Sequence, residues 1–70
     1  MEISDYDILG VNPNDSFNTI KRVYYDLSRI YHPDSNYINI LSKEEKNIAF
    51  QKIQTAYNNI KSKLNIYEVD

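Results

Sequence analysis

Residues 27–34 read LSRIYHPD, and this stretch decides the fold because it marks the place where a helix must end. Pro33 fixes its own φ angle and pushes the residue before it out of the helical region. Upstream, apolar side chains recur at helical spacing and form one stripe, which consists of Phe17, Ile20, Val23, Tyr24, Leu27 and Tyr31. The sequence therefore predicts an amphipathic helix over residues 16–31, followed by a loop over residues 32–41.

A second amphipathic segment follows this loop. Ser42 and Glu45 stand three residues apart, which is the spacing of a capping box at a helix N-terminus. We therefore expect a helix over residues 43–62, with an apolar stripe made of Ala49, Phe50, Ile53, Ala56, Tyr57, Ile60 and Leu64. Two amphipathic helices joined by a short loop pack antiparallel, so the two segments should form a hairpin.

A short helix is predicted over residues 5–9, before the hairpin and lying across it. Ser4 or Asp5 can cap its start, and Gly10 stands where a left-handed C-cap residue is wanted. Asp15 or Ser16 can cap the helix that follows. The expected fold class is all-α, with a core made of Tyr6, Leu9, Ile20, Leu27, Tyr31, Phe50, Ile53, Ala56, Tyr57 and Ile60.

The remaining residues, 63–70, carry no strong signal, and we interpret them as a tail or a short, degenerate fourth helix. The whole chain of 70 residues is then one domain. No segment alternates apolar and polar side chains for long enough to predict a paired strand.

The composition excludes several classes of function. With no cysteine and a single histidine, the chain has neither a disulfide framework nor an ordinary zinc site. A single glycine rules out a glycine-rich phosphate loop, and the net charge of −2 argues weakly against nucleic-acid binding. No apolar run reaches membrane-spanning length, and no signal peptide is recognisable. We expect a cytoplasmic monomer with no metal, no cofactor and no catalytic residue, because the convergent groups of an active site are missing.

Four segments in order resemble the J domain of the DnaJ-type co-chaperones, the heat-shock forty-kilodalton class. They are DYDILGV at residues 5–11, IKRVY at residues 20–24, IYHPD at residues 30–34 and FQKIQTAY at residues 50–57. The resemblance covers about residues 4 to 62, and its specificity lies in all four segments standing at the family's spacing. It implies the J-domain fold, in which the second and third helices, here residues 16–31 and 43–62, form the hairpin. The first helix, here residues 5–9, crosses it.

The resemblance also implies a function, which is to bind a seventy-kilodalton heat-shock chaperone of the DnaK class and to stimulate its ATPase. In the family, the aspartate of the His-Pro-Asp motif pairs with an arginine of the chaperone, and a basic helix face meets an acidic patch. Asp34 is then the partner of a guanidinium, Pro33 limits the poses of the loop, and His32 forms hydrogen bonds within it. The residues assigned to partner binding are His32, Pro33, Asp34, Lys21, Arg22, Tyr24, Tyr25, Arg29 and Asn36.

The sequence departs from the family's pattern at three positions. Many J domains have two basic residues where this chain has Tyr25 and Asp26, and a basic residue often follows the motif where this chain has Ser35. Three cations against one acid leave the second helix with a charge of +2. Because Asp26 is spaced to pair with both Arg22 and Arg29, we expect weak attraction to an acidic patch.

Three functions are therefore compatible with the sequence. The first is an active co-chaperone, and the second is a J-like interaction module that binds a partner without stimulating ATP hydrolysis. The third is a small nucleic-acid binder in which the helix over residues 16–31, with its arginines and tyrosines, is a recognition helix. The ten-residue loop is long for a helix-turn-helix motif, which counts against the third function. The motif itself also has a plain interpretation as a helix stop with a hydrogen-bonded histidine.

The client and the host are not encoded in these features. A client would have to bind through regions outside this chain, since no client-binding module is recognisable within it. Ile, Asn and Tyr fill 26 of the 70 positions, and their codons are AT-rich. That bias is typical of an AT-rich genome, whether of a large DNA virus, a protozoan parasite or a bacterium.

Overall fold

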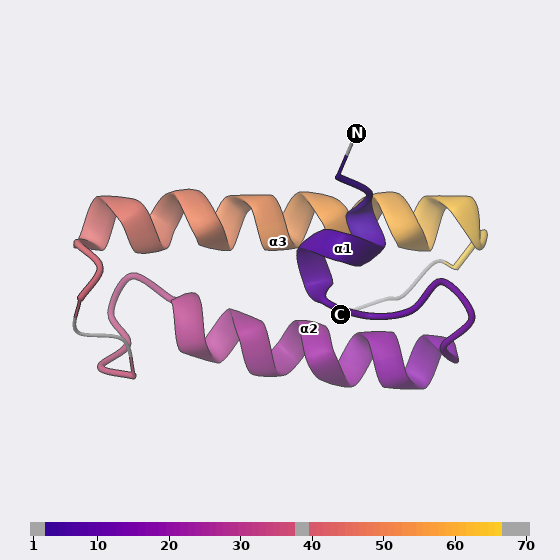
Figure 1. The fold of residues 1–70 in the computed structure, drawn as a ribbon, viewed down its shortest axis with the longest axis horizontal. Helices are drawn as coiled ribbons and strands as arrows, with labels where there is room; N and C mark the ends of the chain where they lie inside the picture. The colour runs from indigo at the N-terminus through magenta and orange to yellow at the C-terminus, as the bar shows by residue number, and fades with distance from the viewer. Residues whose placement is uncertain (1–2, 38–39, 67–70) are drawn as a thin grey trace.

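Three helices make up the fold of the computed structural model, which describes residues 3–37 and 40–66. They are α1 (Asp5–Leu9), α2 (Phe17–Tyr31) and α3 (Lys43–Lys63). The two long helices run antiparallel, and α1 lies across the hairpin (Figure 1). Within the described residues no strand occurs. The predicted all-α class and the hairpin crossed by a short helix are thus confirmed.

Each helix begins after a serine whose hydroxyl accepts a hydrogen bond from a backbone N–H of the first turn. Ser4 and Ser42 form capping boxes, because the side chains of Asp7 and Glu45 accept a bond from the serine's own backbone N–H. Ser16 is the cap of α2, so this helix begins one residue later than the predicted start. For α1 and α2 the serine, and not the neighbouring Asp5 or Asp15, is the cap, and Ser42 is the cap that was expected for α3.

The ends of α1 and α3 are closed by residues in the left-handed region. Gly10 has a φ of 71°, and the next N–H, of Val11, donates to the carbonyl of Tyr6. Asn65 has a φ of 54° after the end of α3, where the N–H of Ile66 donates to the carbonyl of Lys61. This cap lets α3 run to Lys63, one residue beyond its predicted end. Of the predicted tail over residues 63–70, Lys63 belongs to α3 and residues 67–70 lie outside the described part.

The core lies where the three helices meet, and most of it comes from α3. Its buried members are Leu9, Ile20, Ile53, Ala56, Tyr57 and Ile60. Tyr6, Leu27 and Tyr31 are half-buried and pack against this cluster. Phe50 was also predicted in the core, but it is half-buried and lies away from the cluster, toward the loop after α2.

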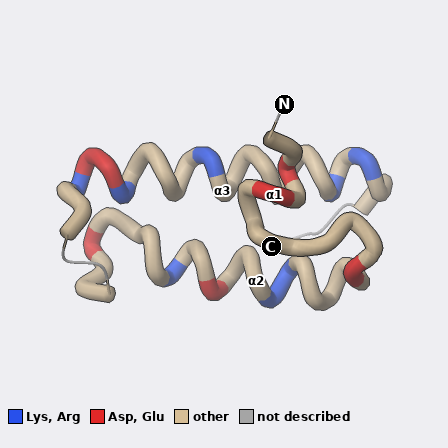
Figure 2. The backbone as a smooth tube through the Cα atoms, in the orientation of Figure 1, with Lys and Arg blue, Asp and Glu red and all other residues tan. Residues whose placement is uncertain are grey.

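Charge is distributed unevenly along the hairpin. In α3 the acids Glu44 and Glu45 occupy the first turn and the cations Lys61 and Lys63 the last, an arrangement that complements the helix dipole. Along α2, acidic and basic positions alternate instead of forming one basic surface (Figure 2). Among the helices described, none has the length and apolar character that crossing a membrane requires.

Candidate functional site

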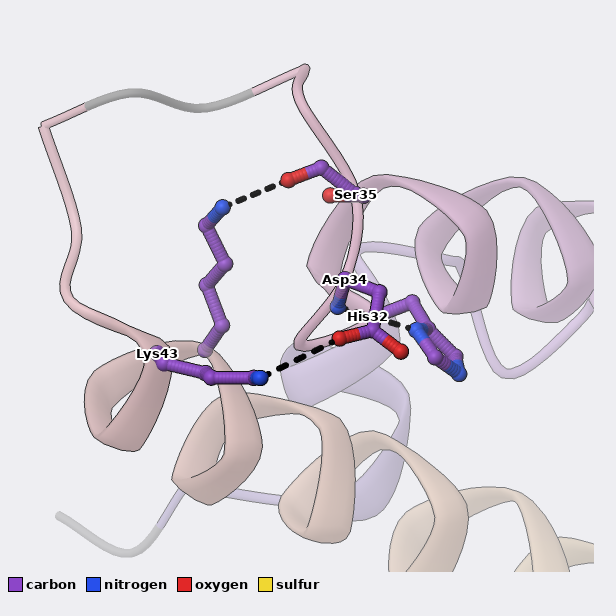
Figure 3. Close-up of polar contacts among 5 residues, drawn as sticks. His32, Asp34, Ser35 and Lys43 are labelled. Atoms are coloured by element: carbon purple, nitrogen blue, oxygen red, sulfur yellow. Dashed lines mark hydrogen bonds and ion pairs between the residues drawn. The ribbon is translucent and has the colours of Figure 1, made fainter.

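The His-Pro-Asp segment lies at the end of the hairpin where α2 stops. His32 follows the last helical residue with a φ of −58° and a ψ of 137°, so the chain leaves the helix there, as expected for a residue before proline. Two residues later, the side chain of Asp34 is 73% exposed. The fold therefore presents the Asp34 carboxylate at the end of the hairpin (Figure 3).

Three short-range hydrogen bonds fold this segment into a turn. The Nδ1 atom of His32 accepts the backbone N–H of Asp34 at 3.1 Å, and the His32 carbonyl accepts the N–H of Ser35 at 2.8 Å. The Ser35 hydroxyl donates to the carbonyl of Ile30 at 2.6 Å, one of the carbonyls that the end of a helix leaves without a partner. His32 is thus an acceptor within the loop, which requires that Nδ1 carries no proton.

Three contacts connect the turn to α3. The ring of Phe50 meets the His32 ring edge-on, with centroids 5.6 Å apart. The ammonium of Lys43 lies 3.4 Å from a carboxylate oxygen of Asp34, and the ammonium of Lys46 donates to the carbonyl of Ser35 at 2.6 Å (Figure 3). The turn after α2 is therefore fixed against the first half of α3.

Neither Lys43 nor Lys46 is among the site residues predicted from the sequence. A signal was present, because two cations stand in the first four positions of a helix, at the end where its dipole disfavours positive charge. Nothing in that signal identifies their partners, which lie 9 and 11 residues upstream in the chain.

The capping box at the start of α3 sets where these lysines lie. The backbone N–H of Ser42, and to a lesser extent its hydroxyl, hold the pKa of Glu45 below its ordinary value. Because the charged carboxylate accepts these hydrogen bonds more strongly than the neutral one, the capping box is most stable while Glu45 is ionised.

Two open hollows flank the exposed carboxylate. One, of about 440 Å³, is lined by Asp34, Ser35, Asn36 and Tyr37. The other, of about 460 Å³, is lined by Pro33, Lys43, Glu44 and Asn47. A partner's side chain therefore has room beside Asp34, and Asn36 lies on the same surface.

Four other residues assigned to partner binding lie on α2 outside its core stripe, namely Lys21, Arg22, Tyr25 and Arg29. Lys21 is half-buried, whereas Arg22 and Arg29 are exposed and Tyr25 is 51% exposed. Asp26 pairs with Arg29 at 2.7 Å. Among the described residues it makes no such pair with Arg22, so local pairing neutralises one arginine and not both.

Tyr24, which the family resemblance assigns to the partner surface, is half-buried and packs against the core. Its ring stacks on that of Tyr57 with centroids 3.9 Å apart and planes at 6°, and Tyr57 also stacks on Phe17. The position belongs to the apolar stripe of α2, so helical periodicity turns this ring toward the core. Tyr25, one residue on, is the tyrosine that remains at the surface.

The exposed side chains of the turn are those of His32 and Asp34. Within residues 3–37 and 40–66, no three metal-ligating side chains gather. An exposed carboxylate on a fixed turn, beside space for a side chain, can instead form a charge-assisted contact with another protein.

Comparison with known proteins agrees with this geometry. A protein-family model described as DnaJ domain matches residues 4–69. The chain is 44% identical over 52 residues to the chaperone protein DnaJ of Thermosipho africanus, a match that covers 74% of this chain and 13% of that protein. It is 40% identical over 55 residues to the co-chaperone protein DjlA of Haemophilus ducreyi, covering 74% of this chain and 19% of that protein.

A third relative has a different name. Over 35 residues the chain is 54% identical to the curved DNA-binding protein of Escherichia coli, a match that covers 49% of this chain and 11% of that protein. The chain therefore spans less than a fifth of the length of each of these relatives. No solved structure matches it significantly.

Proposed function

The chain belongs to the DnaJ domain family, and we propose that it binds a seventy-kilodalton heat-shock chaperone of the DnaK class and stimulates its ATPase through the turn His32–Asp34. The domain supplies a contact, and the chaperone supplies the chemistry. The observation that supports this proposal is the exposed Asp34 carboxylate, held at the tip of the hairpin by bonds to both long helices.

The contact we propose is between Asp34 and a guanidinium of the chaperone. A carboxylate pairs with an arginine through two parallel hydrogen bonds, which gives directional specificity as well as attraction. Pro33 and the bond from the Asp34 N–H to His32 restrict the backbone that carries the carboxylate. Such preorganisation lowers the ordering cost on binding.

The outward face of α2 contributes less to this contact. The ion pair between Asp26 and Arg29 leaves little net positive charge there, and Tyr25 replaces a cation with an exposed ring. Long-range attraction to an acidic surface should therefore be weak. The low positive charge of this face favours a second candidate function, that of a J-like module that binds a partner without accelerating ATP hydrolysis.

The experiment that tests the proposal is single-turnover ATP hydrolysis by a DnaK-class chaperone, with and without the domain. We expect the wild-type domain to accelerate hydrolysis and His32→Gln to accelerate it less, because the substitution alters the acceptor that holds the Asp34 backbone. Binding measured in parallel separates the two candidates. A domain that binds and leaves the hydrolysis rate unchanged would support the non-stimulating module.

A nucleic-acid role has weaker support. The relative named as a DNA-binding protein aligns with this chain over 35 residues at 54% identity, and the aligned part is 11% of that protein. The net charge of −2 is unfavourable for a surface that must contact phosphates. A titration with duplex DNA at two salt concentrations tests this role, and salt-dependent binding would revive it.

A further inference from the structure

Lys46 is the only charged residue that is buried in the described part of the chain, with 8% of its surface exposed. Its ammonium donates to the backbone carbonyl of Ser35 at 2.6 Å (Figure 3). The two residues are 11 positions apart, and the bond joins the turn after α2 to α3. The cation paired with the Asp34 carboxylate is Lys43 and not Lys46, and so the burial of Lys46 needs a separate explanation.

The position is costly for a lysine. Burial of a charge is unfavourable unless polar partners compensate for the lost water. Lys46 is also the fourth residue of α3, near the end of the helix where the dipole repels cations, although Glu44 and Glu45 in the same turn offset this. An apolar residue would fill the space at a lower cost. A lysine fits because its aliphatic stem can be buried while the ammonium reaches the turn.

Ser35 is the point where the two helices are joined. Its N–H and its hydroxyl donate to the carbonyls of His32 and Ile30, which ties it to the end of α2. Its carbonyl accepts from Lys46, which ties it to α3. Since Ser35 directly follows Asp34, these three bonds fix the peptide on the C-terminal side of the functional carboxylate.

We infer that Lys46 is a positioning residue for Asp34, which clamps the Ser35 carbonyl to α3 and so keeps the carboxylate in one pose before the chaperone binds. The effect on the chaperone rests on the proposed function, whereas the clamp itself does not. If the clamp is lost, the turn samples other poses, and the apparent affinity becomes the intrinsic affinity multiplied by the fraction of molecules in the competent pose.

The test compares Lys46→Met with Lys43→Met. Methionine keeps the unbranched stem and removes the ammonium, and Lys43 is a matched control because it lies one turn away and contacts the same loop through an exposed side chain. Amide hydrogen exchange is measured by NMR at Ser35 and Asp34. Hydrogen bonds to charged groups are among the stronger ones. We therefore expect the exchange rate of the Ser35 amide to rise about tenfold in Lys46→Met and much less in Lys43→Met.

The same variants are then titrated in the single-turnover hydrolysis assay. Lys46→Met should raise the half-saturating domain concentration several-fold and leave the rate at saturation unchanged, because binding restores the competent pose. Lys46→Arg retains a cationic donor and should keep exchange at Ser35 close to that of the wild type. A residue that only fills the core would instead show a lower melting temperature and faster exchange throughout α2 and α3.

Two results would overturn the inference. One is unchanged exchange at Ser35 in a folded Lys46→Met, and the other is a loss of protection spread over the whole domain in Lys46→Met and in Lys46→Arg alike. If the wild-type domain does not accelerate hydrolysis at any concentration, the proposed function is wrong together with the chaperone part of this inference. The exchange data still decide whether the clamp exists.

Discussion

At the scale of single residues, Asp34 already has a cationic neighbour in its own chain. The Lys43 ammonium lies 3.4 Å from its carboxylate, and both side chains are largely exposed. Exposed pairs of this kind contribute about 0–1 kcal/mol, because water screens them and both side chains lose freedom. A guanidinium of a partner therefore competes with a weak internal contact.

Removal of that contact should help binding. We predict that Lys43→Met lowers the half-saturating concentration in the hydrolysis assay by up to about fivefold, which corresponds to the upper end of the energy of an exposed pair. Circular dichroism checks that the helices are intact. A higher half-saturating concentration would mean that Lys43 attracts the chaperone instead of competing with its arginine.

The pair between Asp26 and Arg29 leads to a second prediction at this scale. Asp26→Arg releases Arg29 and changes the charge of α2 from +2 to +4. At low salt we expect association with the chaperone to become about three- to tenfold faster, since steering grows with net charge. Asp26→Asn, which removes the acid without adding a cation, should give a smaller gain. Equal binding by all three proteins at low salt would show that this face does not meet an acidic surface.

At the scale of elements, the start of α3 depends on the ionisation of Glu45. The pKa of this group is lowered in the folded protein by its bonds from Ser42, so the unfolded chain binds the proton more readily. The stability that this carboxylate contributes is therefore present above its unfolded-state pKa. It is lost as the pH falls from there through the lowered pKa of the folded state.

The prediction is a difference between two variants in acid. The melting temperature of the wild type should fall more than that of Glu45→Gln when the pH is lowered into the range where glutamate titrates. Glutamine still accepts a hydrogen bond but has no charge to lose. Glu44→Gln is the control, because Glu44 lies in the same turn outside the capping box. If the melting temperatures of the wild type and Glu45→Gln fall equally as the pH is lowered, the ionised Glu45 does not stabilise the start of α3.

The sequence predicted the elements better than it predicted the contacts between them. Serine caps, the stop at Pro33 and the apolar stripes are local signals, and the helices they predict lie within one or two residues of those observed. The clamp by Lys46 and the packing of Phe50 on His32 are not local. Periodicity shows which face of a helix is apolar, but it does not show which residue of a loop will meet that face.

Tyr24 shows the same limit of sequence patterns at the level of one residue. A family resemblance assigned it to the partner surface, whereas its place in the stripe assigned it to the core, and the stack on Tyr57 agrees with the stripe. Asn65 was missed for another reason. An asparagine after a helix is a weak C-cap signal, and its left-handed conformation becomes evident only from the backbone.

At the scale of the whole molecule, a small core must keep the antiparallel helices α2 and α3 packed together so that the turn stays in place. Ile20 and Ile60 are the largest side chains that are fully buried in the described residues. A domain of this size has a total stability of only several kcal/mol, so each of these side chains accounts for a large share.

Truncation of one core residue tests that view. We predict that Ile60→Val costs about 1 kcal/mol of unfolding free energy and Ile60→Ala about 2–5 kcal/mol, measured by urea denaturation. Ile48→Ala is the matched control in the same helix, because Ile48 is 55% exposed, and its cost should stay within about 0.5 kcal/mol. If Ile60→Ala costs no more than Ile48→Ala, the core does not lie where the three helices meet.

The hairpin, the turn and the clamp combine to present one carboxylate, and one substitution tests this directly. Asp34→Asn keeps the shape of the side chain and removes its charge, and because the position is exposed we expect the variant to stay folded. Single-turnover ATP hydrolysis by a DnaK-class chaperone is measured at saturating domain. We predict acceleration by the wild-type domain and a rate close to that of the chaperone alone with Asp34→Asn. Equal acceleration by the two proteins would contradict the proposed mechanism.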